Sequence, residues 1–230
     1  MKTKQIYYED SYQKEIKCNI LSVEPKGILL NVVLDQTIFY PEGGGQSSDK
    51  GHIGEAKVEY VRLSDGEIIH QVQGELKTGE NVTALLDWNW RYKYMKIHTA
   101  GHALHDVLMT MFEGLYPIRG SHGKKAFLEY QGELDASKKD EIEKKVNEAL
   151  QADLPVNTKE STYDELEKEC RFLPPHLPKD KPLRMIKIGS YAPMPDGGVH
   201  VKTTKEIGTI WIANISSQEG KVKIRYGVAG

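Results

Sequence analysis

The chain has 230 residues, of which 39% are hydrophobic and 28% are charged, and its formal net charge at pH 7 is −2. This composition is typical of a soluble globular protein, long enough for one large domain or two small ones. No apolar run approaches the length of a membrane helix, and the polar residues 1–5 lack a signal peptide's hydrophobic region, so we expect a cytoplasmic protein. Cys18 and Cys170 lie far apart in the sequence and predict reduced thiols rather than a disulfide framework.

Short strands are predicted from about residue 17 to residue 87, where runs of strand-forming residues are separated by turn residues. The pair Asp65-Gly66 predicts a hairpin turn between two of these strands. Several strands at this spacing, with no helical pattern between them, favour a small antiparallel barrel. The expected strands span residues 18–23, 27–35, 56–63, 67–72 and 82–87.

Three consecutive glycines, Gly43, Gly44 and Gly45, interrupt this strand region. Ordering them costs conformational entropy, so a folded protein keeps such a run where the backbone bends with positive φ or approaches a ligand closely. Phe39 and Tyr40 are expected to anchor the loop. A plain flexible turn is the alternative.

An amphipathic helix is predicted next. Apolar or small residues recur at steps of three or four from Ile97 to Met111, and His98, His102 and His105 form the adjoining stripe. Residues four apart stack one helical turn above each other, so His98 and His102 would present two imidazoles to a single metal ion. Ordinary surface or core histidines are the alternative, because a histidine pair alone is a weak signal.

The predicted helix begins at a cap supplied by Asp87 or Asn89 and stops near Gly114. Helices followed by a run of strands indicate an α+β layer with helices on one side of an antiparallel sheet. A proline-rich stretch makes a rigid connection between them, with His176 as a surface loop residue. The expected elements are a strand over 126–130, an amphipathic helix from Ser137, a helix opened by the capping box Thr162–Glu165 and ending near Cys170, and strands over 184–188, 200–203, 209–215 and 222–226.

Asp196 and His200 lie at the join between two of the later strands and are a second pair of candidate metal ligands. In a fully extended strand they would be about 13 Å apart, too far for ligands about 2 Å from one ion. A turn at Gly197-Gly198 would fold Asp196 back toward His200.

Charge is distributed unevenly along the second half of the chain. Acidic residues outnumber basic ones between Glu129 and Cys170, whereas basic residues dominate from Arg171 to Gly230. Such a positive segment could hold a phosphate backbone, and a solvated basic face is the alternative.

Several motifs of the sequence resemble those of a known protein family. The histidine pair, the element Gly197–Val201 and the sequence Lys205–Gly208 resemble the second additional domain shared by alanyl- and threonyl-tRNA synthetases and the free-standing AlaX editing proteins. The stretch Phe39–Gln46 resembles the glycine-rich motif of the longer AlaX proteins. The resemblance spans nearly the whole chain and shows no aminoacylation domain, so it implies an editing protein that acts in trans.

The resemblance implies a hydrolase that cleaves the ester of mischarged tRNA for alanine, chiefly Ser-tRNA(Ala), with Gly-tRNA(Ala) as a second candidate. It implies Zn²⁺ as cofactor and tRNA as partner, with no membrane partner. A homodimer is the candidate assembly. The implied α+β fold has an N-terminal antiparallel β-barrel domain over residues 1–88, which carries the glycine-rich motif. An editing domain over residues 89–230 follows, an α/β two-layer arrangement with helices packed on an antiparallel sheet.

Matched by position, His98, His102 and His200 take the places of family zinc ligands, and Asp196 takes the place of a ligand that is usually cysteine. A carboxylate keeps the ligand charge but lacks the softer sulfur that favours zinc. Either Asp196 completes a shell of three histidines and one aspartate, or water fills the fourth position and Asp196 acts as a base or supports a ligand. Direct ligation is the preferred interpretation.

The implied mechanism uses the metal to orient the substrate amine or to polarise a water, and backbone donors to stabilise the oxyanion. Thr99 would distinguish seryl from alanyl groups by hydrogen bonding, or is a buried threonine bonded to its own helix. His105 is a ligand, a proton shuttle or a polar residue at the pocket rim, and the last is favoured. Gln46 and Gly43–Gly45 would close over the acylated end.

Four lysines are expected to contact tRNA, namely Lys124, Lys125, Lys202 and Lys205, and a purely solvent-exposed role is the alternative for each. Three other functions stay open. They are a tRNA-binding module without catalysis, suggested by the missing cysteine; a metal-dependent hydrolase of small esters or amides; and an editing protein to which a partner synthetase presents the substrate.

Overall fold

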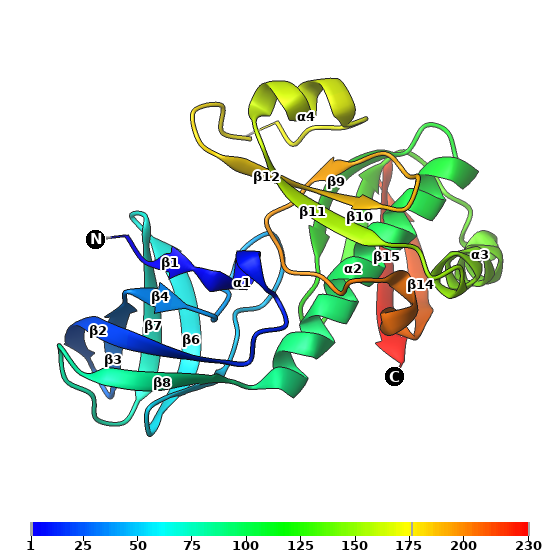
Figure 1. Ribbon diagram of the computed structural model, residues 1–230. Coiled ribbons are helices and arrows are strands. Elements are labelled where there is room, and N and C mark those ends of the chain that lie inside the picture. Colours follow the sequence, from blue (N-terminus) through cyan, green and yellow to red (C-terminus); the bar gives the residue numbers. More distant parts are fainter. Residues whose placement is uncertain (1, 176, 230) are drawn as a thin grey trace. The chain divides into compact units, whose positions relative to one another are not determined.

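The computed structural model describes residues 2–175 and 177–229, and the chain divides into two compact units, Met1–Tyr94 and Met95–Gly230 (Figure 1). Helices and antiparallel sheets both occur, so the predicted α+β class is confirmed. The boundary between the units falls within a long helix, and the predicted division into functional domains stays a prediction. His176, expected in a surface loop, lies outside the described residues.

Six strands of the first unit hydrogen-bond in the order β2-β3-β7-β6-β5-β8, and β8 pairs back with β2. Alternate side chains along these strands fill the interior, where Val32, Val58 and Val72 are fully buried. Asp65 and Gly66 join β6 to β7 at positive φ, which is the predicted Asp-Gly hairpin. The strands are β2 (Glu15–Lys26), β3 (Leu29–Leu34), β5 (Gly51–Ile53), β6 (Ala56–Ser64), β7 (Glu67–Gln73) and β8 (Asn81–Leu86).

All five strands expected in this region are present. The sequence analysis missed only elements of two to four residues, because so short a segment shows no periodicity. Besides β5, these are β1 (Lys4–Gln5), which pairs in parallel with β4 (Gln36–Thr37), and the helix α1 (Ile6–Glu9).

The glycine-rich segment forms a tight turn. Gly44 and Gly45 have φ angles of 56° and 78°, in the left-handed region that favours glycine, and a backbone hydrogen bond of 2.9 Å closes the turn on the Gly43 carbonyl oxygen. Phe39 and Tyr40 are buried, and the Tyr40 hydroxyl donates to the same Gly43 oxygen at 3.0 Å. Their predicted anchoring role is therefore confirmed.

A buried ion pair fixes the chain on both sides of this turn. Arg91, near the start of α2 (Trp88–Met111), contacts Asp49, and both side chains are almost completely buried. The Arg91 guanidinium also donates to the Ile38 carbonyl oxygen, and the Tyr40 backbone N–H donates to the Asp49 carboxylate at 2.6 Å. Because an unpaired buried charge is costly, the two charges keep each other in place.

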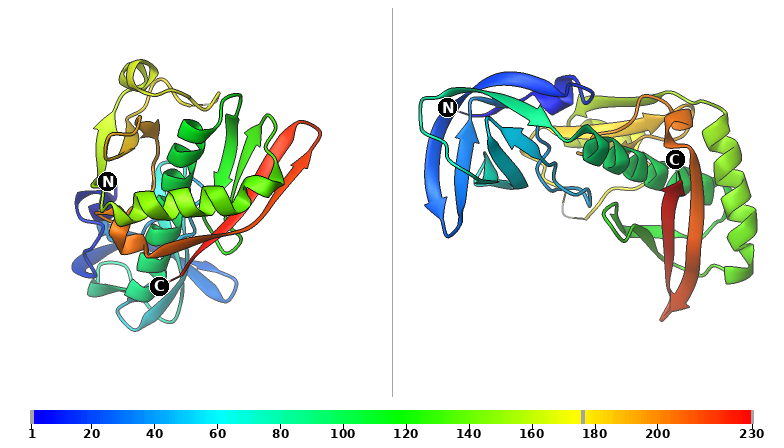
Figure 2. Two further views of the ribbon diagram at one scale, coloured as in Figure 1. Left: turned by 90° about the vertical axis from the view of Figure 1, so that its right-hand side faces the viewer. Right: turned by 90° about the horizontal axis from the view of Figure 1, so that it is seen from below.

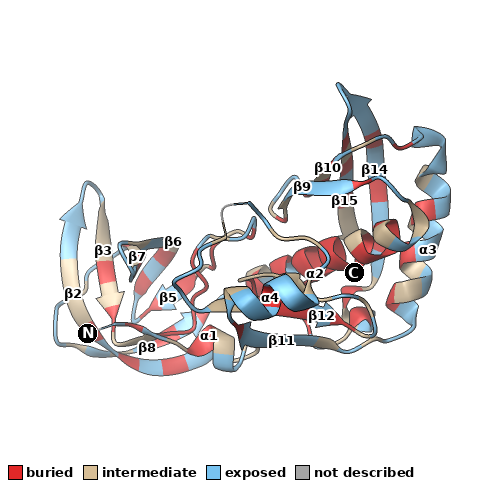
Figure 3. Cartoon of the chain, turned by 90° about the horizontal axis from the view of Figure 1, so that it is seen from above, coloured by how far each residue is buried: buried red, intermediate tan, exposed pale blue. Residues whose placement is uncertain are grey.

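Helix α2 passes from the first unit into the second, and most of its residues are buried (Figure 3). Asp87 caps its start by accepting a hydrogen bond from the Trp90 backbone N–H at 3.1 Å, as predicted. The helix ends at Met111, shortly before Gly114 with φ of 79°, in agreement with the predicted stop. Within the described ranges, no helix is both long and apolar enough to span a membrane.

The second unit contains two antiparallel sheets, with strand orders β14-β15-β10-β9 and β11-β12-β13. The predicted apolar face of α3 is confirmed, because Ile142, Val146 and Leu150 are fully buried. The side-chain amide of Asn147 in α3 donates to the Ile210 carbonyl oxygen and accepts from the Ile210 backbone N–H, both at 2.9 Å. These two hydrogen bonds hold the helix against β14 (Figure 2). The elements are β9 (Tyr116–Ser121), β10 (Phe127–Gln131), α3 (Lys139–Gln151), β11 (Val156–Ser161), α4 (Tyr163–Glu169), β12 (Leu183–Ile188), β13 (Met194–Pro195), β14 (Thr209–Gln218) and β15 (Lys221–Ala229).

One predicted strand of this unit is wrong. Residues 200–203 lead into the 3₁₀ helix Thr204–Ile207. The Glu206 side chain accepts from the backbone N–H groups of Lys202 and Thr203 at 2.9 and 3.2 Å, and this capping interaction bends the chain away from extended pairing. The sequence analysis also missed β9, β11 and β13; β9 and β11 have mostly exposed side chains without apolar alternation, and β13 has two residues.

Two further predictions are confirmed, one on a helix cap of the second unit and one on the two cysteines of the chain. Thr162 and Glu165 form the predicted capping box at the start of α4. Cys18 and Cys170 are free thiols, and burial raises the pKa of each to about 11. Both thiols therefore stay protonated at neutral pH and are poor nucleophiles.

Candidate metal centre

Four side chains converge in the second unit. His98 and His102 project from α2, while Asp196 and His200 follow β13, and their potential ligand atoms all lie within 4.8 Å of one another. One oxygen of Asp196 is 3.1 Å from His98 Nε2 and 3.4 Å from His102 Nε2. The other oxygen is 2.7 Å from His200 Nε2. The structure thus brings the helical histidine pair and the later aspartate–histidine pair to one point.

Thr99 determines which nitrogen of His200 faces this point. The Thr99 hydroxyl donates its single hydrogen to the Met95 carbonyl oxygen at 2.8 Å, so it can only accept from its other neighbours. It accepts from the Val201 backbone N–H at 3.3 Å and lies 3.2 Å from His200 Nδ1, which must therefore carry a hydrogen. The Nε2 lone pair of His200 is left facing the cluster, as metal ligation requires.

Met194 determines which ring nitrogen of His102 carries the hydrogen. A thioether sulfur has no hydrogen to donate, so the contact of 2.7 Å from His102 Nδ1 to Met194 Sδ requires the hydrogen on Nδ1. His102 Nε2 is buried and makes no hydrogen bond within the described part of the chain. The turn at Gly198 contributes as well, because its backbone N–H donates to Asp196 at 2.6 Å and folds the carboxylate back toward His200.

Burial and proximity set the protonation of the cluster. Burial lowers the pKa of His102 and lowers that of His200 to about 4, which keeps both imidazoles neutral at pH 7. Burial alone would raise the pKa of Asp196, but its histidine neighbours, His98 first, outweigh burial and hold that pKa well below the usual range. His102 and His200 therefore offer neutral imidazole nitrogens and Asp196 an ionised carboxylate, which are the protonation states of metal ligands.

His122, which the sequence analysis did not single out as a ligand neighbour, supports the centre from the other side. Its ring stacks on His98 with centroids 4.2 Å apart, and its Nδ1 lies 2.7 Å from the Tyr226 hydroxyl, which itself donates to the Ile97 carbonyl oxygen. A Cβ atom at Gly101 would overlap both the Tyr226 hydroxyl and the His122 ring. A glycine in the middle of a helix was the one sequence signal of this close approach.

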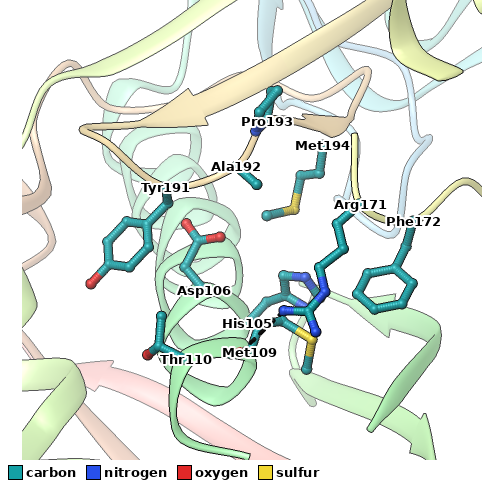
Figure 4. A pocket seen from close by; sticks show the side chains of 10 residues that line it. All are labelled: His105, Asp106, Met109, Thr110, Arg171, Phe172, Tyr191, Ala192, Pro193 and Met194. Carbon is teal, nitrogen blue, oxygen red and sulfur yellow. Dashed lines mark hydrogen bonds between the residues drawn. The ribbon is translucent and has the colours of Figure 1, made fainter. Parts of the chain in front are cut away.

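His105 is not part of the group of four. Its Nδ1 lies 3.0 Å from the Tyr130 hydroxyl, the two rings stack within 9° of parallel, and burial lowers the pKa of His105 to about 4. The imidazole lines a cavity that also has Met194 in its wall (Figure 4). Met194 thus lies between this cavity and His102.

Comparison with known proteins identifies the family. Residues 2–90 match the family model for class II (A) tRNA synthetases. The chain is 31% identical to the alanyl-tRNA editing protein AlaX-M of Methanosarcina barkeri, over 94% of this chain and 94% of that protein. It belongs to the AlaX family. The family resemblance of the sequence motifs is thereby confirmed.

Other relatives are longer than this AlaX chain. It is 39% identical to the alanyl-tRNA editing protein AlaX-L of Pyrococcus horikoshii, over 90% of this chain but 53% of the relative. It is 34% identical to an alanine–tRNA ligase of Pyrobaculum neutrophilum, over 93% of this chain but 25% of the ligase. The chain thus spans about half of the first relative and about a quarter of the second.

The remaining candidate site residues of this AlaX chain are dispersed. Lys124 and Lys125 are exposed between β9 and β10. Lys202 is exposed just before the 3₁₀ helix, and Lys205 is exposed within it. Gln46, with the three glycines before it, belongs to the first unit and is buried. The expected contacts of these residues with tRNA and with its acylated end stay predictions.

Proposed function

We propose that this chain is a trans-editing hydrolase that deacylates mischarged tRNA for alanine, with a metal ion held by His98, His102, Asp196 and His200. One observation carries the proposal: in a chain of the AlaX family, four buried donors from two distant segments meet within 4.8 Å. Hydrolysis is proposed because such a centre can activate water next to an ester.

The metal is zinc in this proposal. Three imidazole nitrogens and one carboxylate oxygen are donors that zinc accepts in a tetrahedral arrangement. The buried Nε2 of His102, which makes no hydrogen bond within the described residues, and the Nδ1-protonated state of His200 both suit a ligand role. Asp196 is a direct ligand rather than a base, because it lies next to all three imidazoles.

Zinc held by these four donors would supply Lewis-acid activation by taking a water molecule or the ester carbonyl as an additional ligand. The residues around it orient the ligands and keep out bulk water. Thr99 is completely buried with its hydrogen already donated to its own helix, so we assign it to positioning His200 rather than to sensing the substrate side chain. His105, neutral and hydrogen-bonded to Tyr130, serves as a polar wall residue rather than a proton shuttle.

The substrate is chiefly Ser-tRNA(Ala), and Gly-tRNA(Ala) is the second candidate. Gln46 and the glycine turn contact the acylated end, and Lys124, Lys125, Lys202 and Lys205 contact the phosphate backbone. The finer fold, a barrel domain followed by a two-layer editing domain with the boundary after residue 88, belongs to the same proposal. The cytoplasmic location and the homodimer considered from the sequence stay predictions.

The test is deacylation by the purified chain, first stripped of metal with a chelator and then reloaded with zinc. We expect hydrolysis of Ser-tRNA(Ala) only in the reloaded sample, with Ala-tRNA(Ala) spared. His102→Ala should remove activity together with the metal, whereas Lys138→Ala, an exposed control away from the centre, should leave both unchanged. Binding of tRNA without hydrolysis at any zinc level would contradict the proposal, and so would equal hydrolysis of a seryl ester that lacks the tRNA body.

A further inference from the structure

A cavity of about 110 Å³ lies in the second unit, next to the candidate metal centre (Figure 4). Its wall is mostly apolar and includes Met109, Phe172 and Met194. Met194 also touches His102, so the cavity and the centre share a wall. A sealed cavity of about 150 Å³ can hold a benzene ring, so this cavity, which is not fully enclosed, has room for part of a planar ring.

Asp106 is a polar residue of the cavity wall that the proposed mechanism does not use. It is 5% exposed, and its Oδ2 atom has no hydrogen-bond partner within the described residues. Figure 4 shows its carboxyl projecting from α2 toward the segment 191–194 across the cavity. Buried polar groups are nearly always hydrogen-bonded, so this carboxyl oxygen in a cavity wall indicates a site where water or a ligand completes the hydrogen bonding.

The chemistry of this carboxyl limits what the ligand can be. Burial raises the pKa of Asp106 to about 8, which favours the neutral form at neutral pH. A neutral carboxyl places an O–H donor beside a carbonyl acceptor. Adenine offers the complementary pair, an exocyclic amine donor beside a ring-nitrogen acceptor. The edges of the other unpaired bases also carry a donor beside an acceptor, so the carboxyl recognises a base, and the terminal position of the nucleotide makes that base adenine.

The mouth of the cavity supplies surfaces on which a base can stack. The Arg171 guanidinium carbon lies 5.3 Å from the Phe172 ring centroid, and its Nη1 donates to the Met109 carbonyl oxygen at 3.3 Å. The exposed ring of Tyr116 meets Phe172 edge-on at 6.1 Å. Unpaired bases are commonly held by stacking on aromatic rings and arginine planes, and Arg171 adds positive charge for a phosphate.

The spacing from the metal centre fits an aminoacylated nucleotide. Asp106 is one helical turn beyond His102, about 6 Å along the axis. In an aminoacyl-tRNA the ester is on the terminal ribose, so the base is one sugar away from the ester carbonyl. We infer that the adenine of the terminal nucleotide of tRNA enters this cavity with one edge and stacks at its mouth while the ester lies at the candidate metal centre. The inference rests on the proposed function.

Titration of the purified, zinc-loaded chain with AMP tests the inference, with NMR shifts as the readout. Asp106→Asn keeps a donor beside an acceptor and should leave the AMP dissociation constant within about twofold. Asp106→Leu removes both and should weaken AMP binding roughly five- to hundredfold, the range for one bidentate base contact. Ribose 5-phosphate, which lacks the base, should bind more weakly than AMP to the wild type. Phe172→Ala should weaken AMP binding in a chain with the carboxyl intact.

Tyr163→Ala, an aromatic residue of α4 outside the cavity, is the matched control and should bind AMP like the wild type. A merely structural role of Asp106 predicts that Asp106→Leu unfolds at a higher temperature with unchanged AMP affinity, and that result would overturn the inference. Equal affinity for AMP and ribose 5-phosphate would also overturn it.

The AMP titration needs no hydrolysis, so it separates the two proposals. Specific AMP binding by a chain that never deacylates tRNA would support the cavity assignment and refute the proposed function. Deacylation with the same KM for Ser-tRNA(Ala) in the wild type and Asp106→Leu would support the function and refute the cavity assignment.

Discussion

Thr99 joins the candidate metal centre to α2 through one hydroxyl group. Its hydrogen goes to the Met95 carbonyl, and its two acceptor positions are taken by His200 and Val201. A side chain of the same shape without the hydroxyl would leave a buried backbone N–H unpaired and the His200 ring without a fixed tautomer. We therefore expect Thr99 to contribute to metal affinity although it is not one of the four candidate ligands.

Replacing Thr99 by valine should weaken zinc binding by about ten- to hundredfold, the usual cost of losing a group that orients a ligand. Thr99→Ser keeps the hydroxyl and should bind zinc nearly as well as the wild type. Competition with a chromophoric chelator measures both dissociation constants. If Thr99→Val binds zinc like the wild type, the hydroxyl does not orient His200.

At the scale of elements, His70 of β7 hydrogen-bonds to two other strands of the first unit, β3 and β4. Its Nδ1 lies 3.0 Å from the Val32 carbonyl oxygen in β3 and must donate to it, and its Nε2 accepts from the Thr37 hydroxyl of β4 at 2.8 Å. The Thr37 oxygen in turn accepts from the Phe39 backbone N–H at 3.0 Å, just before the glycine-rich turn. Only a neutral imidazole can make both bonds.

The stability of the first unit should therefore fall in acid. Burial lowers the pKa of His70 from its ordinary value of 6.5 to about 4. Between these two pH values the unfolded chain binds a proton that the folded chain does not, so the free energy of unfolding decreases as the pH falls, by at most about 3 kcal/mol. Above pH 6.5 the full stability is present.

Urea denaturation at pH 7 and at pH 5 measures this effect. His70→Gln has an amide that can donate and accept but does not titrate in this range, so its stability should change less between the two pH values. An equal change in the variant and the wild type would assign the acid sensitivity to other groups.

At the scale of the whole molecule, the two units differ in what they bring to the proposed reaction. All four candidate ligands and the cavity belong to the second unit, while the glycine-rich turn belongs to the first. A ligand that binds only the folded state stabilises the part of the chain that it binds.

Zinc should therefore stabilise the second unit selectively. At a free concentration one hundred times its dissociation constant the stabilisation should be about 2.7 kcal/mol. Hydrogen exchange followed by mass spectrometry, with and without zinc, should show slower exchange in peptides of residues 95–229 and little change in residues 2–87. Equal protection in both ranges would contradict a metal site confined to the second unit.

The sequence by itself determined the features that depend on near neighbours along the chain. The Asp65-Gly66 hairpin, the Thr162–Glu165 capping box and the apolar stripe of α3 need only local geometry, and all three are present. The spacing of His98 and His102 on α2 is also local, because residues four apart on a helix lie on the same face. The expected strand over residues 200–203 failed because a capping interaction from Glu206 outweighed local strand preference.

Only the tertiary structure decided what these local features meet. Asp196 reaches the α2 histidines because packing of distant segments and the Gly198 turn place it there. The stacking of His122 on His98 also depends on such packing, and so does the burial of Asp106 Oδ2 without a hydrogen-bond partner among the described residues. Contacts between distant segments depend on how whole elements pack, and no periodicity along the chain encodes that arrangement.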